Sequence, residues 1–183
     1  MPKYGLLDPG TCLPVLEAVC HVFDIKNAVE FGCGLWSTNT LARTCQNVTS
    51  IENVKDWIDT MKQEQIHRKN LKFIHWTKPM NKALKTIEKA DLIFIDGDDR
   101  IECLKDSFGK SAIIICHDTH ASTQNWNEVQ VPTEYRMLTY TGCQPYLTTI
   151  FYHVDTNLKD MLFDRKNYSH KNTYVDKDFW IDI

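Results

Sequence analysis

Short apolar runs recur along the first two thirds of the chain. Their starts lie roughly 20 residues apart, and each has the length of a β-strand. The runs are Ala28–Phe31, Val48–Ile51, Leu71–Trp76, Leu92–Ile95 and Ala112–Cys116. The last two are apolar at every position, which is typical of parallel strands covered by helices on both faces.

Helical spacing separates these runs. Four segments place apolar residues three and four positions apart, so that each forms one apolar stripe. The stripes are Leu16/Val19/Cys20/Phe23, Val54/Trp57/Ile58/Met61, Met80/Ala83/Leu84/Ile87 and Ile101/Leu104/Phe108. The alternation of strands and helices predicts an α/β, Rossmann-like three-layer sandwich with a mostly parallel sheet. Ligands of this architecture bind at the carboxyl ends of the strands.

The last third has a different pattern. Segments 135–141 and 147–153 are rich in Tyr, Thr, Phe and Ile and are separated by Gly142 to Pro145, which predicts an antiparallel strand pair. We expect a single domain over residues 1–154. Residues 155–183 form a polar tail, docked or mobile, that is also a candidate contact in a homo-oligomer. Its aromatic residues are Phe163, Tyr168, Tyr174, Phe179 and Trp180.

Composition narrows the class of protein. The 183 residues are 43% hydrophobic and carry a net charge of −3, values that favour a soluble globular protein over a nucleic-acid or membrane binder. No apolar run approaches the ~18 residues of a membrane span. Seven cysteines without a Cys-x-x-Cys pair predict reduced thiols and a cytoplasmic location. Residues 54–90 carry nine Lys or Arg against four acids, either a solvated helix face or a basic patch.

The strongest signal for a ligand site follows the first strand. Gly32-Cys33-Gly34 opens a helix, and such a turn lets a ligand approach the backbone. Glu52 ends the second strand, 20 residues after Gly32, where an acid is suited to the hydroxyls of a ribose. Together these features indicate a cofactor that contains adenosine.

Two residues distinguish between adenosine cofactors. A dinucleotide loop would prefer a third glycine where Ser37 stands, and Glu30 would face its pyrophosphate with a like charge. S-adenosylmethionine has no phosphate and carries an ammonium and a sulfonium, which a carboxylate complements. The residues therefore favour S-adenosylmethionine, with a nicotinamide dinucleotide as the less favoured alternative.

The successive motifs resemble those of class I S-adenosylmethionine-dependent methyltransferases, most closely small O-methyltransferase-like members. The motifs span residues 10–154 in the family's order: Glu30 to Gly34, Ser37-Thr38, Ser50 to Glu52, Asp91 to Gly97 and Ile114 to Thr119. The resemblance implies seven strands in the order 3-2-1-4-5-7-6, with the seventh antiparallel. Two positions depart from the pattern: Trp36 replaces a glycine, and Asp99 stands where His is expected.

The resemblance also implies roles for individual residues. Glu30, Gly32 and Gly34 would line the methionine end of the cofactor, and Glu52 would hold the ribose. Trp76 would lie near the adenine. Ser37 and Thr38 would cap the helix near the cofactor's carboxylate, and Asp96 would complete the cofactor site.

An acidic rim is predicted where strands four and five end. Its members are Asp96, Asp98, Asp99, His117, Asp118 and His120. Three interpretations stay open. Asp96 and Asp118 are hard-oxygen ligands suited to Mg²⁺, but Thr119 stands where the family's metal site has an amide. Alternatively His117 or Asp118 is a general base without metal. The third possibility is that the acids only end strands and form turns.

We therefore expect a methyltransferase acting on a hydroxyl of a small molecule or sugar, with Asp96, His117 and Asp118 as catalytic residues. A divalent metal is not favoured, and no residue is assigned as a metal ligand. A nucleic-acid or protein acceptor is the first alternative. A non-catalytic adenosyl-binding interaction subunit is the second.

Overall fold

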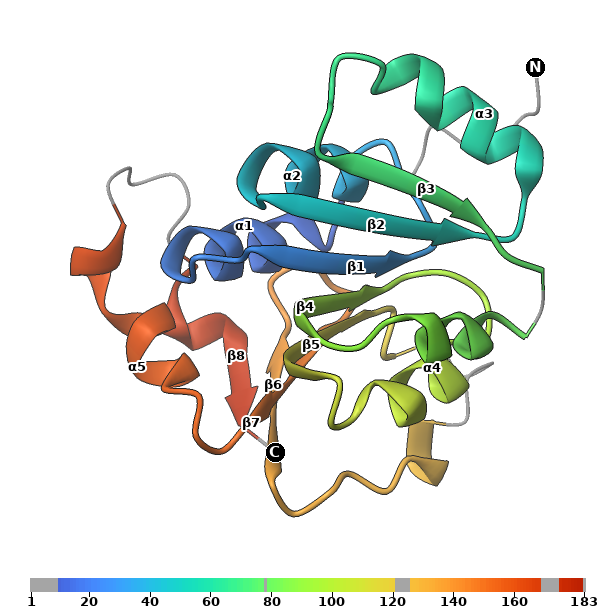
Figure 1. Ribbon diagram of the computed structural model, residues 1–183. Coiled ribbons are helices and arrows are strands. Elements are labelled where there is room, and N and C mark those ends of the chain that lie inside the picture. The colour runs from blue at the N-terminus through green and yellow to red at the C-terminus, as the bar shows by residue number, and fades with distance from the viewer. Residues whose placement is uncertain (1–9, 78, 121–125, 169–174, 183) are drawn as a thin grey trace.

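The computed structural model describes residues 10–77, 79–120, 126–168 and 175–182. Residues 1–9 of the expected domain and Tyr174 of the tail lie outside this part. One eight-stranded sheet runs through the molecule in the order β3-β2-β1-β4-β5-β7-β6-β8 (Figure 1). The strands are β1 Asn27–Phe31, β2 Asn47–Glu52, β3 Leu71–His75, β4 Ala90–Ile95, β5 Ser111–His117, β6 Tyr135–Tyr140, β7 Thr148–His153 and β8 Trp180–Asp182.

The first five strands are parallel, and β7 pairs antiparallel with both β5 and β6. The predicted fold class and the predicted order of the first seven strands are therefore confirmed. The count of seven is wrong, because the tail adds β8. Residues Trp180–Asp182 pair antiparallel with Leu138–Tyr140 of β6, and the Trp180 ring packs 5.2 Å from that of Tyr140.

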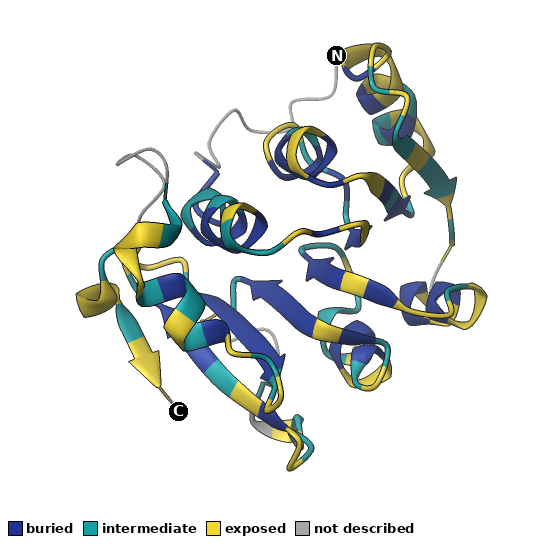
Figure 2. Ribbon diagram, turned by 60° about the vertical axis from the view of Figure 1, so that its left-hand side comes forward, coloured by how far each residue is buried: buried dark blue, intermediate teal, exposed yellow. Residues whose placement is uncertain are grey.

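Helices cover both faces of the sheet, as expected for a buried parallel sheet. One face carries α1 Leu13–Val22, α2 Ser37–Thr44, α3 Lys55–Glu64 and α5 Leu158–Phe163. The other carries the 3₁₀ helix η1 Met80–Thr86 and α4 Arg100–Ser107. Short 3₁₀ turns lie at Trp126–Glu128, Arg165–Asn167 and Lys177–Phe179. Figure 2 shows the central strands buried almost throughout, with exposed residues on the outer sides of the helices.

The apolar stripes of the sequence face the sheet. Alternate residues of β1 show how two cores share one strand: Ala28 packs with α1, whereas Val29 and Phe31 pack with η1 and α4. The segment at Met80 is a 3₁₀ helix. The apolar pattern fits both helix types, because residues three apart, such as the buried Met80 and Ala83, align on one face of a 3₁₀ helix too. No helix among the described residues is long and apolar enough to cross a membrane.

Candidate active site

The predicted site residues meet at one end of the sheet. Glu30 and Gly32 lie at the end of β1, Glu52 ends β2, Trp76 follows β3, and Asp96 follows β4. His117 ends β5 and Asp118 follows it. Because β1 to β5 are parallel, all these positions fall at their carboxyl ends, where Figure 1 shows the arrowheads of β1, β2 and β3 pointing together.

Gly32 is required by a close approach between two loops. Its φ is +85°, and a Cβ there would lie 2.5 Å from the Cα and the N of Gly97. The loops that follow β1 and β4 therefore touch backbone to backbone. Only glycine satisfies both the left-handed conformation and the lack of space. The contact keeps the turn after β1 beside Asp96.

Glu30 is a buried carboxyl group beneath that turn. Its Oε2 accepts hydrogen bonds of 2.6 Å from Thr38 Oγ1 and from Ser50 Oγ, whereas its Oε1 is buried without a hydrogen-bond partner in the described structure. Burial raises the pKa of Glu30 from 4.5 to about 7, because desolvation outweighs the stabilising hydroxyls. The site thus holds an acid that titrates near neutral pH.

The start of α2 is held by side chains of the turn. Thr38 Oγ1 accepts from the Gly34 N–H at 2.9 Å while it donates to Glu30. Ser37 is buried, and its Oγ would lie 2.9 Å from a Cβ at Gly34, so a side chain there requires Ser37 to move. The N-cap position is Trp36, which makes no side-chain cap, so Ser37 and Thr38 do not occupy it as expected. Thr38 instead ties the glycine turn to Glu30.

Glu52 binds the backbone of the loops around it. Oε1 accepts from the N–H groups of Asn53 and Val54, both at 2.8 Å, and Oε2 accepts from the Cys33 N–H at 3.2 Å. The Cys33 thiol, a weak donor, also points to Oε2 at 3.9 Å, so the fourth of the carboxylate's roughly four acceptor sites is held only weakly and a ligand hydroxyl could take it. Trp76 is half-buried and donates its backbone N–H to the Glu52 carbonyl oxygen at 2.9 Å.

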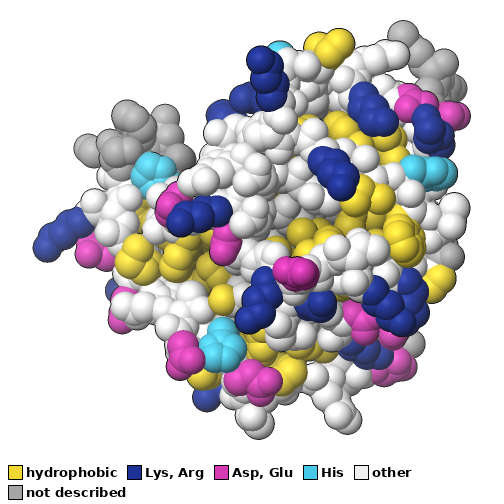
Figure 3. All heavy atoms as spheres, viewed as in Figure 1, with side chains coloured by type: hydrophobic (Ala, Val, Ile, Leu, Met, Phe, Trp, Pro, Cys, Tyr) yellow, Lys and Arg dark blue, Asp and Glu magenta, His cyan; other side chains and the backbone are white. Residues whose placement is uncertain are grey.

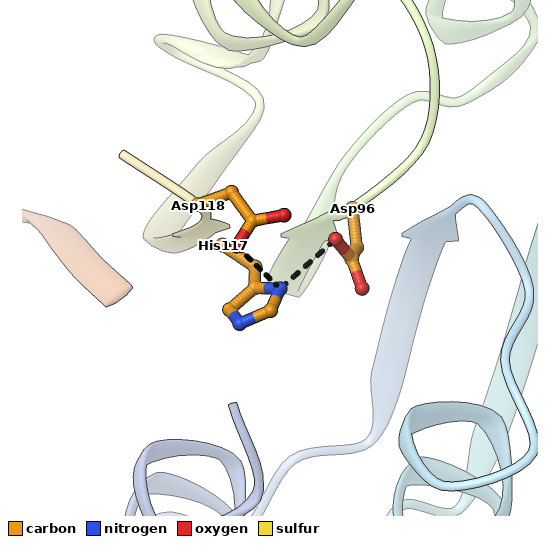
Figure 4. Close-up of side chains that lie close together, drawn as sticks. All are labelled: Asp96, His117 and Asp118. Atoms are coloured by element: carbon orange, nitrogen blue, oxygen red, sulfur yellow. Dashed lines mark hydrogen bonds and ion pairs between the residues drawn. The ribbon is translucent and has the colours of Figure 1, made fainter. Parts of the chain in front are cut away.

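Asp96, His117 and Asp118 form a cluster at the ends of β4 and β5 (Figure 4). The His117 Nδ1 lies 3.1 Å from Asp96 Oδ1 and 3.7 Å from Asp118 Oδ1, and its Nε2 lies 2.7 Å from Thr11 Oγ1. The His117 side chain is 1% exposed, against 21% for Asp96 and 24% for Asp118. The two carboxylates, and not the imidazole, therefore present surface to a ligand.

The other members of the predicted rim turn away from this cluster. Asp98 accepts from Asn53 Nδ2 at 3.0 Å, and Asp99 accepts from the Met80 N–H at 3.0 Å. His120 packs against Tyr146 and accepts from the Leu147 N–H at 3.2 Å. These three thus lie after β4 or β5 as predicted, but their side chains bond to neighbouring loops, whereas the ligand atoms of Asp96, His117 and Asp118 lie within 4.8 Å of one another.

Two residues of the site, Ser50 and Thr11, were not predicted as site residues from the sequence. Ser50 faces Glu30 because the two are register partners on β1 and β2, which the strand prediction would have revealed. Thr11 lies 106 positions from its partner His117 and carries no local signal. Arg100, four residues after Asp96, is by contrast a candidate partner of a local acid or of an anionic substrate from the sequence alone, with the ion pair favoured. It bridges Asp96 Oδ1 and Asp118 Oδ2, each at 2.9 Å, so the ion pair is confirmed.

The surface around the site is apolar with scattered charges. Leu35 and Trp36, which precede α2, and Val54, which precedes α3, are 41%, 56% and 39% exposed. Figure 3 shows hydrophobic side chains at the surface to the right of centre, the side toward which β1 to β3 point in the same view of Figure 1. Lys and Arg side chains are spread over this face and do not gather into one patch.

A cavity of about 620 Å³ lies at the opposite end of the sheet, lined by residues that include Asp91 and Lys110. Asp91 accepts from the N–H groups of Lys26 and Asn27, and Lys110 donates to the Ile87 carbonyl oxygen at 2.7 Å. These charged groups serve the loops at that end.

Comparison with known proteins supports the fold. No protein-family model matches the chain, and no curated protein matches its sequence. A putative caffeoyl-CoA O-methyltransferase from Staphylococcus aureus superposes with a TM-score of 0.61 at 15% identity, over 76% of this chain and 82% of that one. An rRNA methylase from Streptococcus thermophilus superposes with a TM-score of 0.59 at 12% identity, over 76% and 93%.

A third similar structure contains a ligand. N-methyltransferase NodS from Bradyrhizobium japonicum WM9, in complex with S-adenosyl-L-homocysteine, superposes with a TM-score of 0.58 at 15% identity, over 79% of this chain and 86% of that one. The chain therefore has the fold of class I methyltransferases. These three neighbours act on different classes of acceptor, so the likeness does not identify the substrate.

Proposed function

We propose that the chain is a class I S-adenosylmethionine-dependent methyltransferase acting on a hydroxyl of a small molecule or sugar. The observation that carries the proposal is Glu30, a fully buried carboxyl group directly beneath the glycine turn of this fold. Its Oε1 has no partner among the described residues, and its Oε2 is bonded to hydroxyls and not to a cation. A buried acid in that state complements a ligand that brings positive charge without phosphate.

The remaining residues fit the parts of such a cofactor. Gly32 packs against Gly97, and Gly34 leaves the second half of the turn without a side chain, where the methionine end would approach the backbone. A ribose hydroxyl would replace the weak Cys33 thiol contact on Glu52, and Trp76, the first residue after β3, would lie near the adenine. When bound, S-adenosylmethionine supplies an electrophilic methyl group. The protein aligns the acceptor oxygen with it and excludes water.

Asp118 is the candidate general base. Its Oδ2 is bonded to Arg100, and its Oδ1 makes no hydrogen bond among the described residues but is buried 3.7 Å from His117 Nδ1, so an acceptor must displace the groups that cover this oxygen. A substrate hydroxyl that donates to Oδ1 would pass its proton there as the oxygen attacks. Asp96 lies between the cofactor turn and His117. The buried His117 orients Asp96 and is not itself in contact with substrate.

Surface charge supports a small acceptor over a nucleic acid. Two lysines of the basic 54–90 segment are paired with acids: Lys55 with Asp59, and Lys82 with Asp106 at 4.0 Å. These pairs cancel part of the positive charge that phosphate groups would need. The basic segment is thus better explained as a solvated helix face.

The test is formation of S-adenosylhomocysteine from S-adenosylmethionine, measured by mass spectrometry with two acceptor pools. One pool holds hydroxylated metabolites and sugars, and the other holds total RNA. We expect product with the first pool and a loss of about 10²- to 10⁴-fold in Asp118→Asn, the range for removing a general base. Asp155→Asn removes a carboxylate that is 88% exposed and serves as the matched control with unchanged rate. Product with RNA alone would contradict the acceptor class, and no product with either would contradict the function.

A further inference from the structure

Arg100 uses all of its hydrogen-bond donors within the acidic cluster. A guanidinium has five N–H groups. Nε donates to the Gly97 carbonyl oxygen at 2.9 Å, and Nη1 donates to Asp118 Oδ2 at 2.9 Å and to the His117 carbonyl oxygen at 3.2 Å. Nη2 donates to Asp96 Oδ1 at 2.9 Å and to the Asp96 carbonyl oxygen at 3.1 Å. Five bonds thus account for five donors.

The position of this guanidinium is set by the backbone on both sides. Arg100 is the first residue of α4, and the turn from Asp96 to Asp99 brings its side chain back to the strand ends. Asp118 has a φ of +57°, in the left-handed region, which a residue with a Cβ adopts only when its surroundings hold it. Arg100 bonds to both the Asp118 side chain and the preceding carbonyl, so it holds the residue in that conformation.

The same three side chains have the composition of a metal site. One ligand atom each from Asp96, His117 and Asp118 lies within 4.8 Å of the others. Two acids at these strand ends also match the metal-binding acids of the O-methyltransferases that the sequence resembles. The arrangement does not fit a divalent ion, however. The guanidinium already bonds one oxygen of each acid, and a second cation beside it would meet like charge at close range.

We propose that Arg100 is an internal cation that takes the place of a divalent metal in this cluster. It is a positioning residue that orients Asp96 and Asp118 and neutralises part of their charge. Since it has no donor left, it does not bind a phosphate or carboxylate of the acceptor. The acceptor is consequently not one that is held by two adjacent oxygens chelating a metal.

The conclusion about the acceptor rests on the proposed methyltransferase function. The exclusion of a divalent metal by Arg100 holds whether or not the chain transfers methyl groups. Its test therefore reads out metal binding and not activity. Mn²⁺ is a suitable probe because it accepts carboxylate ligands and its unbound ion is counted directly by electron paramagnetic resonance. Failure of the methyltransferase assay and failure of this test are then separate results.

The experiment titrates Mn²⁺ into the wild type, Arg100→Met, and Arg100→Met combined with Asp118→Asn. We expect the wild type to leave Mn²⁺ free and Arg100→Met to bind one ion at least about tenfold more tightly, with the gain lost in the double variant. Arg43→Met is the matched control, because Arg43 pairs with Glu17 on the surface, away from the cluster, and its removal should not create a site. Circular dichroism establishes that each variant is folded.

Two results would overturn the proposal. One is wild-type Mn²⁺ binding that Asp118→Asn abolishes, which would mean that a metal displaces the guanidinium. The other is a folded Arg100→Met that binds Mn²⁺ no better than the wild type. If Arg100→Met does not fold, the comparison of wild type with Asp118→Asn still decides. Equally weak Mn²⁺ binding by the wild type and Asp118→Asn supports the proposal. Arg100→Lys, which keeps the positive charge, should bind Mn²⁺ as weakly as the wild type.

Discussion

Replacing Glu30 with glutamine should make the protein more stable at alkaline pH. Glu30 is 0% exposed, and the wild type must ionise it in the interior once the pH exceeds its pKa. Glutamine keeps the shape and the oxygen that accepts from Thr38 and Ser50, but it cannot ionise. The variant therefore isolates the cost of the buried charge.

The magnitude follows from the shift of the pKa. Folding raises the pKa of Glu30 from 4.5 to about 7. Between these values the folded state holds a proton that the unfolded state has lost, so the free energy of unfolding falls as the pH rises. The favourable contribution is complete below pH 4.5 and is lost as the pH passes 7. At about 1.36 kcal/mol for each pKa unit, the loss amounts to roughly 3 kcal/mol.

Urea unfolding at pH 5, 7 and 8.5, followed by circular dichroism, measures this difference. Glu30→Gln should lie within about 1 kcal/mol of the wild type at pH 5 and exceed it by roughly 3 kcal/mol at pH 8.5. Ser50→Ala should have the opposite effect at pH 8.5, because it removes a hydroxyl that stabilises the ionised carboxylate. Glu64→Gln, at an exposed position of α3, should follow the wild-type pH profile. A Glu30→Gln variant less stable than the wild type at pH 8.5 would refute the reasoning.

Three further predictions concern the turn and its ligand. Gly32→Ala should lower the free energy of unfolding by more than about 3 kcal/mol in chemical unfolding, because its Cβ would meet Gly97. Gly109→Ala, also at positive φ but in open space, should lower it by about 1 kcal/mol, and equal losses would contradict the contact. Glu52→Gln should weaken S-adenosylhomocysteine binding about tenfold in calorimetry, since it removes a charged acceptor; unchanged affinity would remove Glu52 from the site. S-adenosylmethionine should bind more tightly at pH 8 than at pH 6 in the wild type, but equally in Glu30→Gln, because ionised Glu30 attracts a cation; a pH dependence retained in the variant would point to another group.

The sheet could be predicted from sequence because its signals are local. Fully apolar runs such as Ile113–Cys116 reveal buried parallel strands, and the stripe at Val54 and Ile58 reveals a helix that packs on one side. The strand β8 could not be predicted in the same way. Three residues, Trp180–Asp182, give too short a pattern, and their pairing with β6 depends on a return of the chain over 40 positions that no local preference encodes.

The candidate site was predictable to the extent that strand ends converge. Asp96 and His117 follow apolar runs, so a parallel sheet places them together. What the pattern does not contain is where side chains point. Asp98 accepts from Asn53, 45 positions away, and Arg100 turns back to fill the cluster. Both outcomes depend on the shape of the loop after β4, in which Gly97 packs against Gly32 of a distant loop.

The most direct test of the account is calorimetric titration of the purified wild type with S-adenosylhomocysteine. NAD⁺ is titrated separately as the alternative cofactor, and the Gly34→Trp variant, whose side chain would fill the turn, is the control protein. The account predicts a single micromolar site for S-adenosylhomocysteine, no heat with NAD⁺, and loss of binding in folded Gly34→Trp. Absence of binding to S-adenosylhomocysteine, or equal binding in Gly34→Trp, would contradict the claim that this turn holds a methyl-donor cofactor.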